Sequence, residues 1–111
     1  MAAKLVSALS HAYGSQPEHL IAAIGPGICQ ACYEVGAEVA EKFGPEFTRP
    51  SDGAGKYLLD IQAVHRSELL AAGVRDSNVS SLALCTRETP WLPSHRRDHD
   101  GRRFGTLVAL V

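Results

Sequence analysis

The sequence has no long hydrophobic run, since none of its apolar stretches approaches the roughly 18 residues that a membrane-spanning helix requires. Its N-terminus, Met1-Ala2-Ala3-Lys4-Leu5, also lacks the apolar stretch of a secretory signal. An excess of basic charge is missing too, because 11 Lys and Arg residues face 12 Asp and Glu residues and the formal net charge is −1. This balance argues against a general binder of nucleic acids. We therefore expect a soluble, cytoplasmic protein that binds neither a membrane nor a nucleic acid.

Cysteine is scarce: Cys29, Cys32 and Cys85 are the only three, and an odd number without a signal peptide indicates reduced thiols. Cys29 and Cys32 form a C-x-x-C pair, but a structural zinc site usually needs a second such pair or two closely spaced histidines. Cys85 stands alone, and His95 and His99 lie on a different, arginine-rich segment. We therefore predict no metal site. A redox pair that opens a helix, and inert thiols that pack a tight loop, are the two other interpretations.

The length of 111 residues is typical of one domain, and a hydrophobic content of 45% is enough for one core. We predict a single domain over residues 1–111. Hydrophobic periodicity and the positions of glycine and proline divide the chain into elements. They are a helix over Ala2–Tyr13, a strand over His19–Ile24, a helix over Tyr33–Phe43, a loop over residues 45–55, a strand over Lys56–Leu59, a helix from the N-cap Asp60 to about Ala72 with Gly73 as its stop, a strand over Val79–Cys85, an irregular stretch over Thr86–Asp100 and a strand over Phe104–Val111. This order predicts an α+β, α/β-like layered fold with a mixed β-sheet flanked by helices.

Two features could bind an anion. Gly25-Pro26-Gly27 predicts a turn at which the backbone can approach a ligand closely. Residues 86–111 carry five arginines against three acidic residues, and Arg96 and Arg97 are adjacent. Arginine forks and exposed backbone N–H groups are common ways of holding phosphate. An ion pair with Asp98 or Asp100 is the alternative explanation for each arginine.

Three blocks of the sequence resemble, in the same order, the motifs of one protein family. They are Ala23-Ile24-Gly25-Pro26-Gly27-Ile28 with Cys32-Tyr33-Glu34-Val35-Gly36, Lys56-Tyr57-Leu58-Leu59-Asp60 with Gly73-Val74, and Leu84-Cys85-Thr86 with Ser94-His95-Arg96-Arg97-Asp98 and Gly101-Arg102. By these blocks the chain resembles the C-terminal half of the multicopper polyphenol oxidoreductase, or laccase-domain, family. Members of that family are also described as purine nucleoside phosphorylases with adenosine deaminase activity.

The resemblance implies part of an enzyme that processes purine nucleosides, by phosphorolysis of adenosine or inosine and by deamination of adenosine. A laccase-like oxidation of phenols and a non-catalytic interaction domain are the alternatives. The family's zinc or copper is held by a histidine, a cysteine and a second histidine, in segments that this chain lacks. We therefore expect the metal ligands to be absent here, and whether the chain is active alone stays open.

The resemblance and the anion chemistry together predict a pocket for a purine nucleoside and phosphate, without assigning a catalytic residue. The predicted pocket residues are Gly25, Pro26, Gly27, Cys32, Tyr33, His95, Arg96 and Arg97. Half of a sheet domain leaves strand edges and apolar surface exposed. We therefore also expect self-association or binding to a second chain.

Overall fold

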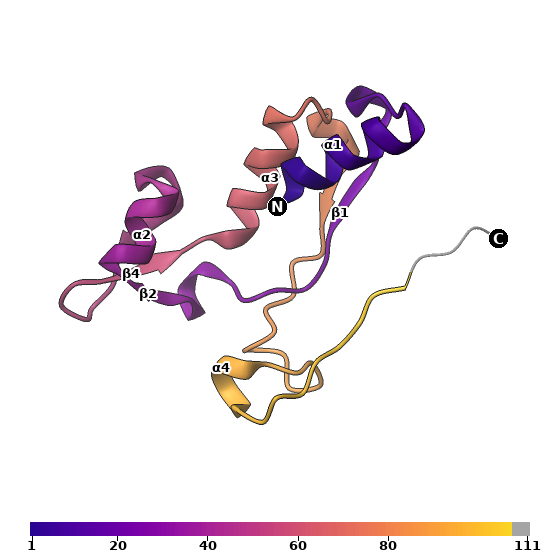
Figure 1. Cartoon of the computed structure of the whole chain (residues 1–111). Coiled ribbons are helices and arrows are strands. Elements are labelled where there is room, and N and C mark those ends of the chain that lie inside the picture. Colours follow the sequence, from indigo (N-terminus) through magenta and orange to yellow (C-terminus); the bar gives the residue numbers. More distant parts are fainter. Residues whose placement is uncertain (108–111) are drawn as a thin grey trace.

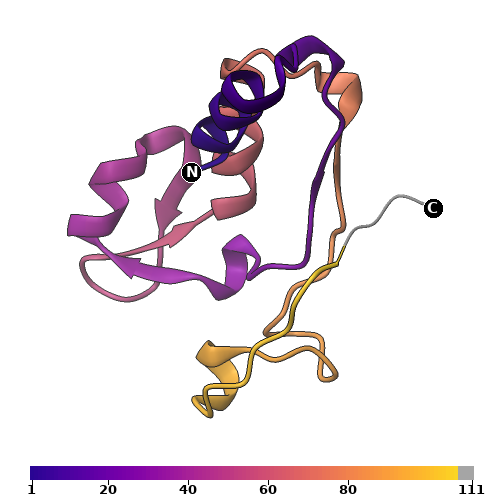
Figure 2. The same cartoon turned by 45° about the vertical axis from the view of Figure 1, so that its right-hand side comes forward.

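The chain folds into two small helix-and-sheet units and a third segment that is mostly irregular. The structure is a computed structural model and describes residues 1–107. Its elements are α1 (Ala2–Tyr13), η1 (Pro17–His19), β1 (Ala22–Ile24), η2 (Gln30–Cys32), β2 (Glu34–Gly36), α2 (Ala37–Phe43), η3 (Pro45–Phe47), β3 (Thr48–Pro50), β4 (Lys56–Leu59), α3 (Ile61–Ala71), η4 (Asp76–Asn78), β5 (Val79–Ser81) and α4 (His95–Asp98), where η denotes a 3-10 turn. Figures 1 and 2 show α4 and its loops lying apart from the other helices. The α+β class is confirmed, and the described strands divide between two sheets.

The first unit consists of helices α1 and α3 and the parallel strand pair β1–β5. Ala22 of β1 lies opposite Val79 of β5, and Ile24 lies opposite Ser81. The two helices lie side by side over these strands (Figure 1). Their shared core contains the buried side chains Val6, Leu69, Val74 and Val79. Burial of these side chains is the main force that holds the unit together, because short strands alone are not stable in water.

The second unit is a three-stranded antiparallel sheet with β4 in the middle, between β2 and β3. Helix α2 contacts both β2 and β4. Leu59 is the most deeply buried side chain of the unit, with 1% of its surface exposed. It packs with Val35, Ala40 and Val64. Because Val64 belongs to α3, this helix contributes to the cores of both units.

The third segment begins after β5 and is held to the chain that follows β1. The backbone N–H of Leu82 donates to the carbonyl of Ile24 at 2.9 Å, and that of Thr86 donates to the carbonyl of Gly27 at 3.0 Å. An isolated parallel bridge joins Gly27 and Cys85. The two stretches therefore run side by side away from the first unit (Figure 2). This pairing brings Cys85 next to the segment that carries Cys29.

The N-terminal helix, the strand over Lys56–Leu59 and the helix after Asp60 form as the sequence predicts. The Asp60 side chain accepts a hydrogen bond from the backbone N–H of Ala63 at 3.0 Å, which is the geometry of an N-cap. Gly73 has a φ of +103°, a conformation that residues other than glycine rarely adopt. It ends α3 as expected, since its backbone N–H donates back to Leu70 at 3.1 Å.

Helix α2 begins later than predicted. The sequence placed its start at Tyr33, whereas the helix covers Ala37–Phe43 and the preceding residues form β2. The spacing of Val35 and Val39 fits a helix, but Val35 pairs with Tyr57 of β4 instead. The partner strand comes from more than 20 positions further along the chain, and helical spacing cannot reveal it.

Several other boundaries were also wrong. The stretch 45–55 contains a 3-10 turn and β3 instead of a loop alone, and α4 interrupts the predicted irregular stretch. The strand predicted over His19–Ile24 is shortened to β1, because Pro17 opens a 3-10 turn there. The strand predicted over Val79–Cys85 ends at Ser81. Residues 104–107 show no regular secondary structure, and the rest of the predicted strand Phe104–Val111 lies outside the described residues.

The molecule exposes more surface than a compact protein of its size. Its radius of gyration is 15.8 Å, against about 13 Å for a compact domain of this length. Its accessible surface is 7741 Å², whereas a monomer of 11.9 kDa should expose about 5,900 Å². Large apolar side chains contribute to the excess, among them Leu5, Ile21 and Trp91. No helix in the described part is long and apolar enough to cross a bilayer.

Candidate functional site

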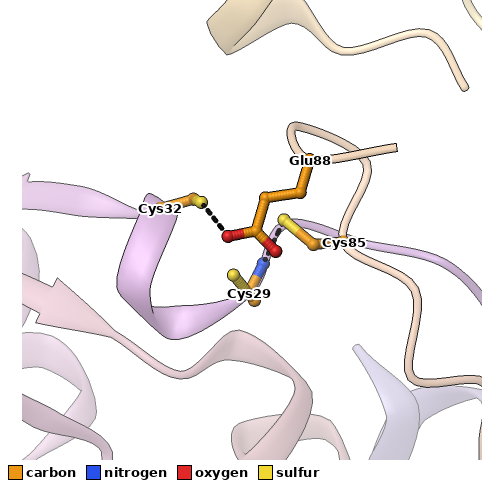
Figure 3. A group of neighbouring side chains, drawn as sticks. All are labelled: Cys29, Cys32, Cys85 and Glu88. Carbon is orange, nitrogen blue, oxygen red and sulfur yellow. Dashed lines mark hydrogen bonds between the residues drawn. The ribbon is translucent and has the colours of Figure 1, made fainter. Parts of the chain in front are cut away.

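Three cysteines and a glutamate from distant parts of the sequence meet where the chain after β5 passes the η2 turn. The thiol sulfurs of Cys29, Cys32 and Cys85 and one carboxylate oxygen of Glu88 all lie within 4.8 Å of one another. The Cys32 thiol donates to the Glu88 carboxylate at 3.5 Å. Figure 3 shows all four side chains converging on one small volume. Cys85 is buried, and Cys29 and Cys32 are half-buried.

Local structure holds the two halves of this thiol cluster in place. Cys29 precedes the η2 turn, and its carbonyl accepts from the backbone N–H of Cys32 at 3.1 Å. The side-chain amide of Gln30 donates to the carbonyls of Phe47 at 3.5 Å and Leu58 at 3.4 Å, which ties the turn to strand β4 and to the chain before β3. On the other side, the bridge between Gly27 and Cys85 sets the register of the second segment. The cluster is therefore held by backbone pairing as well as by its own contacts.

Burial and hydrogen bonding shift the pKa values of two of the three thiols in opposite directions. Burial raises the pKa of Cys85, but backbone N–H groups of Cys29 and Glu88 outweigh it and lower that pKa to about 7. The Cys29 N–H donates to the Cys85 sulfur at 3.3 Å. Burial and the neighbouring Cys29 thiol raise the pKa of Cys32 to about 12, although Arg87 acts in the opposite direction. Cys85 therefore loses its proton at a lower pH than Cys32 does.

A polar cleft of about 620 Å³ opens beside the cluster, with Cys32 in its wall. Three arginines line it from different parts of the chain: Arg49, Arg87 and Arg96. Two acidic residues, Glu34 and Asp52, line it as well. Within residues 1–107, none of the three arginines has a carboxylate oxygen within 4.0 Å, although other arginines of the chain do. Unpaired guanidinium groups that converge on one cleft are typical of an anion-binding site.

Arg96 is the best positioned of the three. Its guanidinium donates to the backbone carbonyl of Glu34 at 2.9 Å and lies over the Tyr33 ring, 5.1 Å from the ring centroid. The carbonyl bond and the ring contact restrain the side chain and leave further N–H donors for a ligand. Tyr33 itself packs against the core of the second unit. Of the predicted pocket residues, Cys32 and Arg96 line the cleft, and Tyr33 contacts Arg96 without lining it.

Arg97 forms, at 2.8 Å, the ion pair with Asp98 that the sequence analysis gave as the alternative to phosphate binding. The same guanidinium also donates to the backbone carbonyls of Thr86, Arg87, Thr89 and Leu92 at 2.7–3.1 Å. Arg97 therefore organises the loop that carries Arg87 and Glu88, and it does not line the cleft.

The other predicted pocket residues lie elsewhere. Gly25, Pro26 and Gly27 do not line the cleft, and neither glycine has a positive φ. A Cβ atom at Gly25 would meet nothing within 4 Å, and one at Gly27 would meet only the Gln62 amide at 3.5 Å. Instead of forming the predicted turn, this segment leads to Gly27, which pairs with Cys85. His95 begins α4 and packs edge-on against His99, with the ring centroids 5.1 Å apart.

Reasoning from sequence missed Arg49 and Arg87 in the cleft and Glu88 in the cluster. Arg49 precedes Arg87 by 38 positions, and only the antiparallel pairing of β3 with β4 brings it to this face. The spacing of residues in the sequence could have identified Glu88. Cys85 and Glu88 are spaced as Cys29 and Cys32 are, so the chain contains C-x-x-C followed by C-x-x-E. In residues 1–107 this is the one group of three or more potential metal ligands, and it includes no histidine.

The sequence of this chain is similar to those of known proteins. A family model described as "Multi-copper polyphenol oxidoreductase laccase" matches residues 1–111. The chain is 38% identical over 80 residues to "Adenosine deaminase RL5" from an unknown prokaryotic organism, a match to 67% of this chain and 30% of that protein. It is 36% identical over 102 residues to "Purine nucleoside phosphorylase YlmD" of Geobacillus stearothermophilus, a match to 86% of this chain and 36% of that protein.

The similarity extends to three dimensions. The crystal structure of YlmD from Geobacillus stearothermophilus superposes with a TM-score of 0.79 at 31% sequence identity, and the match covers 88% of this chain and 39% of that chain. The chain therefore spans well under half the length of the relatives it matches.

Proposed function

The chain belongs to the multi-copper polyphenol oxidoreductase laccase family, and we propose that it supplies the phosphate-binding part of a site that processes purine nucleosides. The observation that carries the proposal is the group of three arginines around one polar cleft, Arg49, Arg87 and Arg96, none of which forms an ion pair within residues 1–107. Relatives named purine nucleoside phosphorylase support the choice of substrate. Phosphate is the second substrate of that reaction, and guanidinium groups bind it through paired N–H donors.

In phosphorolysis a phosphate oxygen bonds to the anomeric carbon of the ribose, and the bond from that carbon to the purine nitrogen breaks. The purine leaves with the bonding electrons and takes up a proton. Binding phosphate beside the ribose makes the attack effectively intramolecular, and positive charge around the phosphate compensates its own charge. Arg96 would hold the phosphate in a fixed direction, since the Glu34 carbonyl and the Tyr33 ring restrain its guanidinium.

The metal of the family does not enter this scheme. The ligands that the resemblance implies are two histidines and a cysteine, and the ligand cluster within residues 1–107 contains no histidine. The residues described here therefore do not fit that metal set, and we assign no step to it. The complete reaction would need a polypeptide that carries those ligands.

Titration of the purified chain with inorganic phosphate, followed by amide chemical shifts, tests the proposal. We expect weak, saturable binding with shifts concentrated at the cleft, and about tenfold weaker binding for Arg96→Gln, because one charge-assisted contact is lost. Arg75→Gln is the matched control: Arg75 is exposed, precedes η4 and does not line the cleft, so this change should leave the affinity unaltered. Equal affinities for the two variants would contradict the proposal.

We propose, as a second function, that the exposed apolar surface is covered by a second copy of this chain. The total accessible surface exceeds that of a compact monomer by roughly 1,800 Å², whereas a dimer of standard size buries about 800 Å² on each partner. An apolar groove of about 410 Å³ runs between α1 and β1, with Leu5 and Ile21 among its lining residues. The strand pair β1–β5 is parallel and has only two strands, which is unusual for a sheet that is not covered on both faces.

A further inference from the structure

The spacing of the thiol cluster in the sequence matches a common class of metal site. Tetrahedral structural zinc sites typically use two pairs of ligands, each pair separated by two to four residues. Cys29 and Cys32 form one pair with two intervening residues, and Cys85 and Glu88 form another. Each pair lies on its own short segment, and the backbone bridge between Gly27 and Cys85 places the two segments side by side. The fold thus provides the usual arrangement, with a carboxylate in the position of the fourth ligand.

The distances suit a tetrahedral ion. Around zinc, with Zn–S bonds of about 2.3 Å, ligand sulfurs lie roughly 3.8 Å apart. The four ligand atoms of the cluster already lie within 4.8 Å of one another, and the Cys32 sulfur is 3.5 Å from the Glu88 oxygen. The largest separation therefore exceeds the spacing in a bound site by at most about 1 Å. Figure 3 shows the four side chains directed toward a shared centre.

The surroundings also suit a site with excess negative charge. Three thiolates and a carboxylate around a divalent cation leave a net charge of −2, which nearby donors must offset. The Cys29 N–H donates to the Cys85 sulfur at 3.3 Å, and the Arg87 guanidinium lies beside the Cys32 thiol. Such outer-shell donors orient and stabilise metal ligands.

We propose that Cys29, Cys32, Cys85 and Glu88 bind one Zn²⁺ in a closed tetrahedral site. Binding displaces the protons that the three thiols still carry, which pass to the solvent, while Glu88 coordinates as the carboxylate. Four protein ligands leave no open position, so the ion holds the segment 85–88 against the η2 turn and does not bind substrate. Cu(I) is the less suitable ion, because a carboxylate oxygen is a poor ligand for it. The site shares Cys32 and Arg87 with the cleft of the proposed phosphate-binding function, but metal analysis tests it without reference to phosphate.

Metal analysis of the whole chain tests this site without an activity assay. The purified chain is loaded with zinc, exchanged extensively into metal-free buffer and analysed by elemental mass spectrometry. We expect about one zinc per chain, and a Co²⁺-substituted sample should show the intense visible absorption of a tetrahedral thiolate site. Zinc should also raise the melting temperature. A zinc content far below one per chain would overturn the proposal.

Variants identify the ligands. Cys85→Ser should abolish stoichiometric binding, and circular dichroism reports whether this variant folds. Glu88→Gln leaves all three thiols in place, so it keeps the test informative if Cys85→Ser unfolds. We expect it to bind zinc at least tenfold more weakly, whereas Glu41→Gln, a change at an exposed residue of α2, should bind like the wild type.

Two results would contradict the zinc assignment. Binding of Cu(I) in preference to zinc, unaffected by Glu88→Gln, would show that only the three thiols act as ligands and would refute the zinc assignment. A loss of two mass units on mild oxidation of the zinc-loaded chain, with release of the metal and a disulfide mapped to Cys29 and Cys32 in a peptide digest, would identify these two as a redox pair and argue against a stable closed site.

Discussion

Replacing Ile21 with aspartate should dissociate the dimer that we propose for the purified chain. Ile21 precedes β1, lines the apolar groove together with Leu5, and has 85% of its surface exposed in the monomer. Burying an isoleucine side chain contributes about 1.5–3 kcal/mol. A dimer with twofold symmetry uses the same surface on both copies, so each substitution counts twice. The expected loss is therefore about 3–6 kcal/mol, before the added cost of burying a carboxylate.

This loss converts to a large change in affinity. Since about 1.4 kcal/mol corresponds to a tenfold change in the dissociation constant, Ile21→Asp should raise that constant at least about 100-fold. Sedimentation equilibrium over a range of concentrations measures the constant directly, and light scattering gives the mass of the species present. Leu107→Asp is the matched control, because Leu107 is 94% exposed but does not line the groove.

Two results would refute this reasoning. A wild-type chain that stays monomeric at its highest soluble concentration would show that the excess surface does not drive self-association. A dimer that both aspartate variants weaken equally would place the interface outside the groove between α1 and β1.

Three further predictions concern the stability of the fold and are checked by denaturant or thermal unfolding. Leu59→Ala should lower the free energy of unfolding by about 2–5 kcal/mol, because Leu59 is almost fully buried in the core of the second unit. Gly73→Ala should destabilise the chain by more than about 1 kcal/mol, since the residue has a φ of +103° and its Cβ would lie 3.0 Å from Pro17. Arg97 holds the pKa of Asp98 below its usual range, so this pair stabilises the fold above about pH 4 and the contribution is lost as the pH falls through the lowered pKa. Asp98→Asn should therefore make the melting temperature less dependent on pH at the acidic end, and an unchanged acid dependence would contradict the pairing.

The elements that form as predicted are those whose signals lie within a few residues. Helix α3 has its N-cap at Asp60 and its stop at Gly73. Each of these signals acts through a backbone group at most four positions away, so local sequence is sufficient. Membership of the family was likewise readable from motif order, since motifs are properties of the sequence itself.

Short strands were decided by pairing with distant residues. Strands β2 and β3 have three residues each, too few for an alternating pattern to stand out from a helical one. Their identity depends on β4, which offers hydrogen-bonding groups on both edges. The same pairing brings Arg49 toward Arg87 and Arg96 and so assembles the cleft.

The sequence by itself therefore determined the long helices, strand β4, the α+β class, the family and the C-x-x-C pair. Only the tertiary structure decided that Cys85 and Glu88 meet Cys29 and Cys32, and that Arg97 holds a loop while Arg96 faces the cleft. The physical reason is the separation along the chain over which each kind of interaction acts. Caps, turns and helices are stabilised by groups a few residues apart, whereas a site requires side chains more than 50 positions apart to meet, and backbone pairing between distant segments sets that geometry.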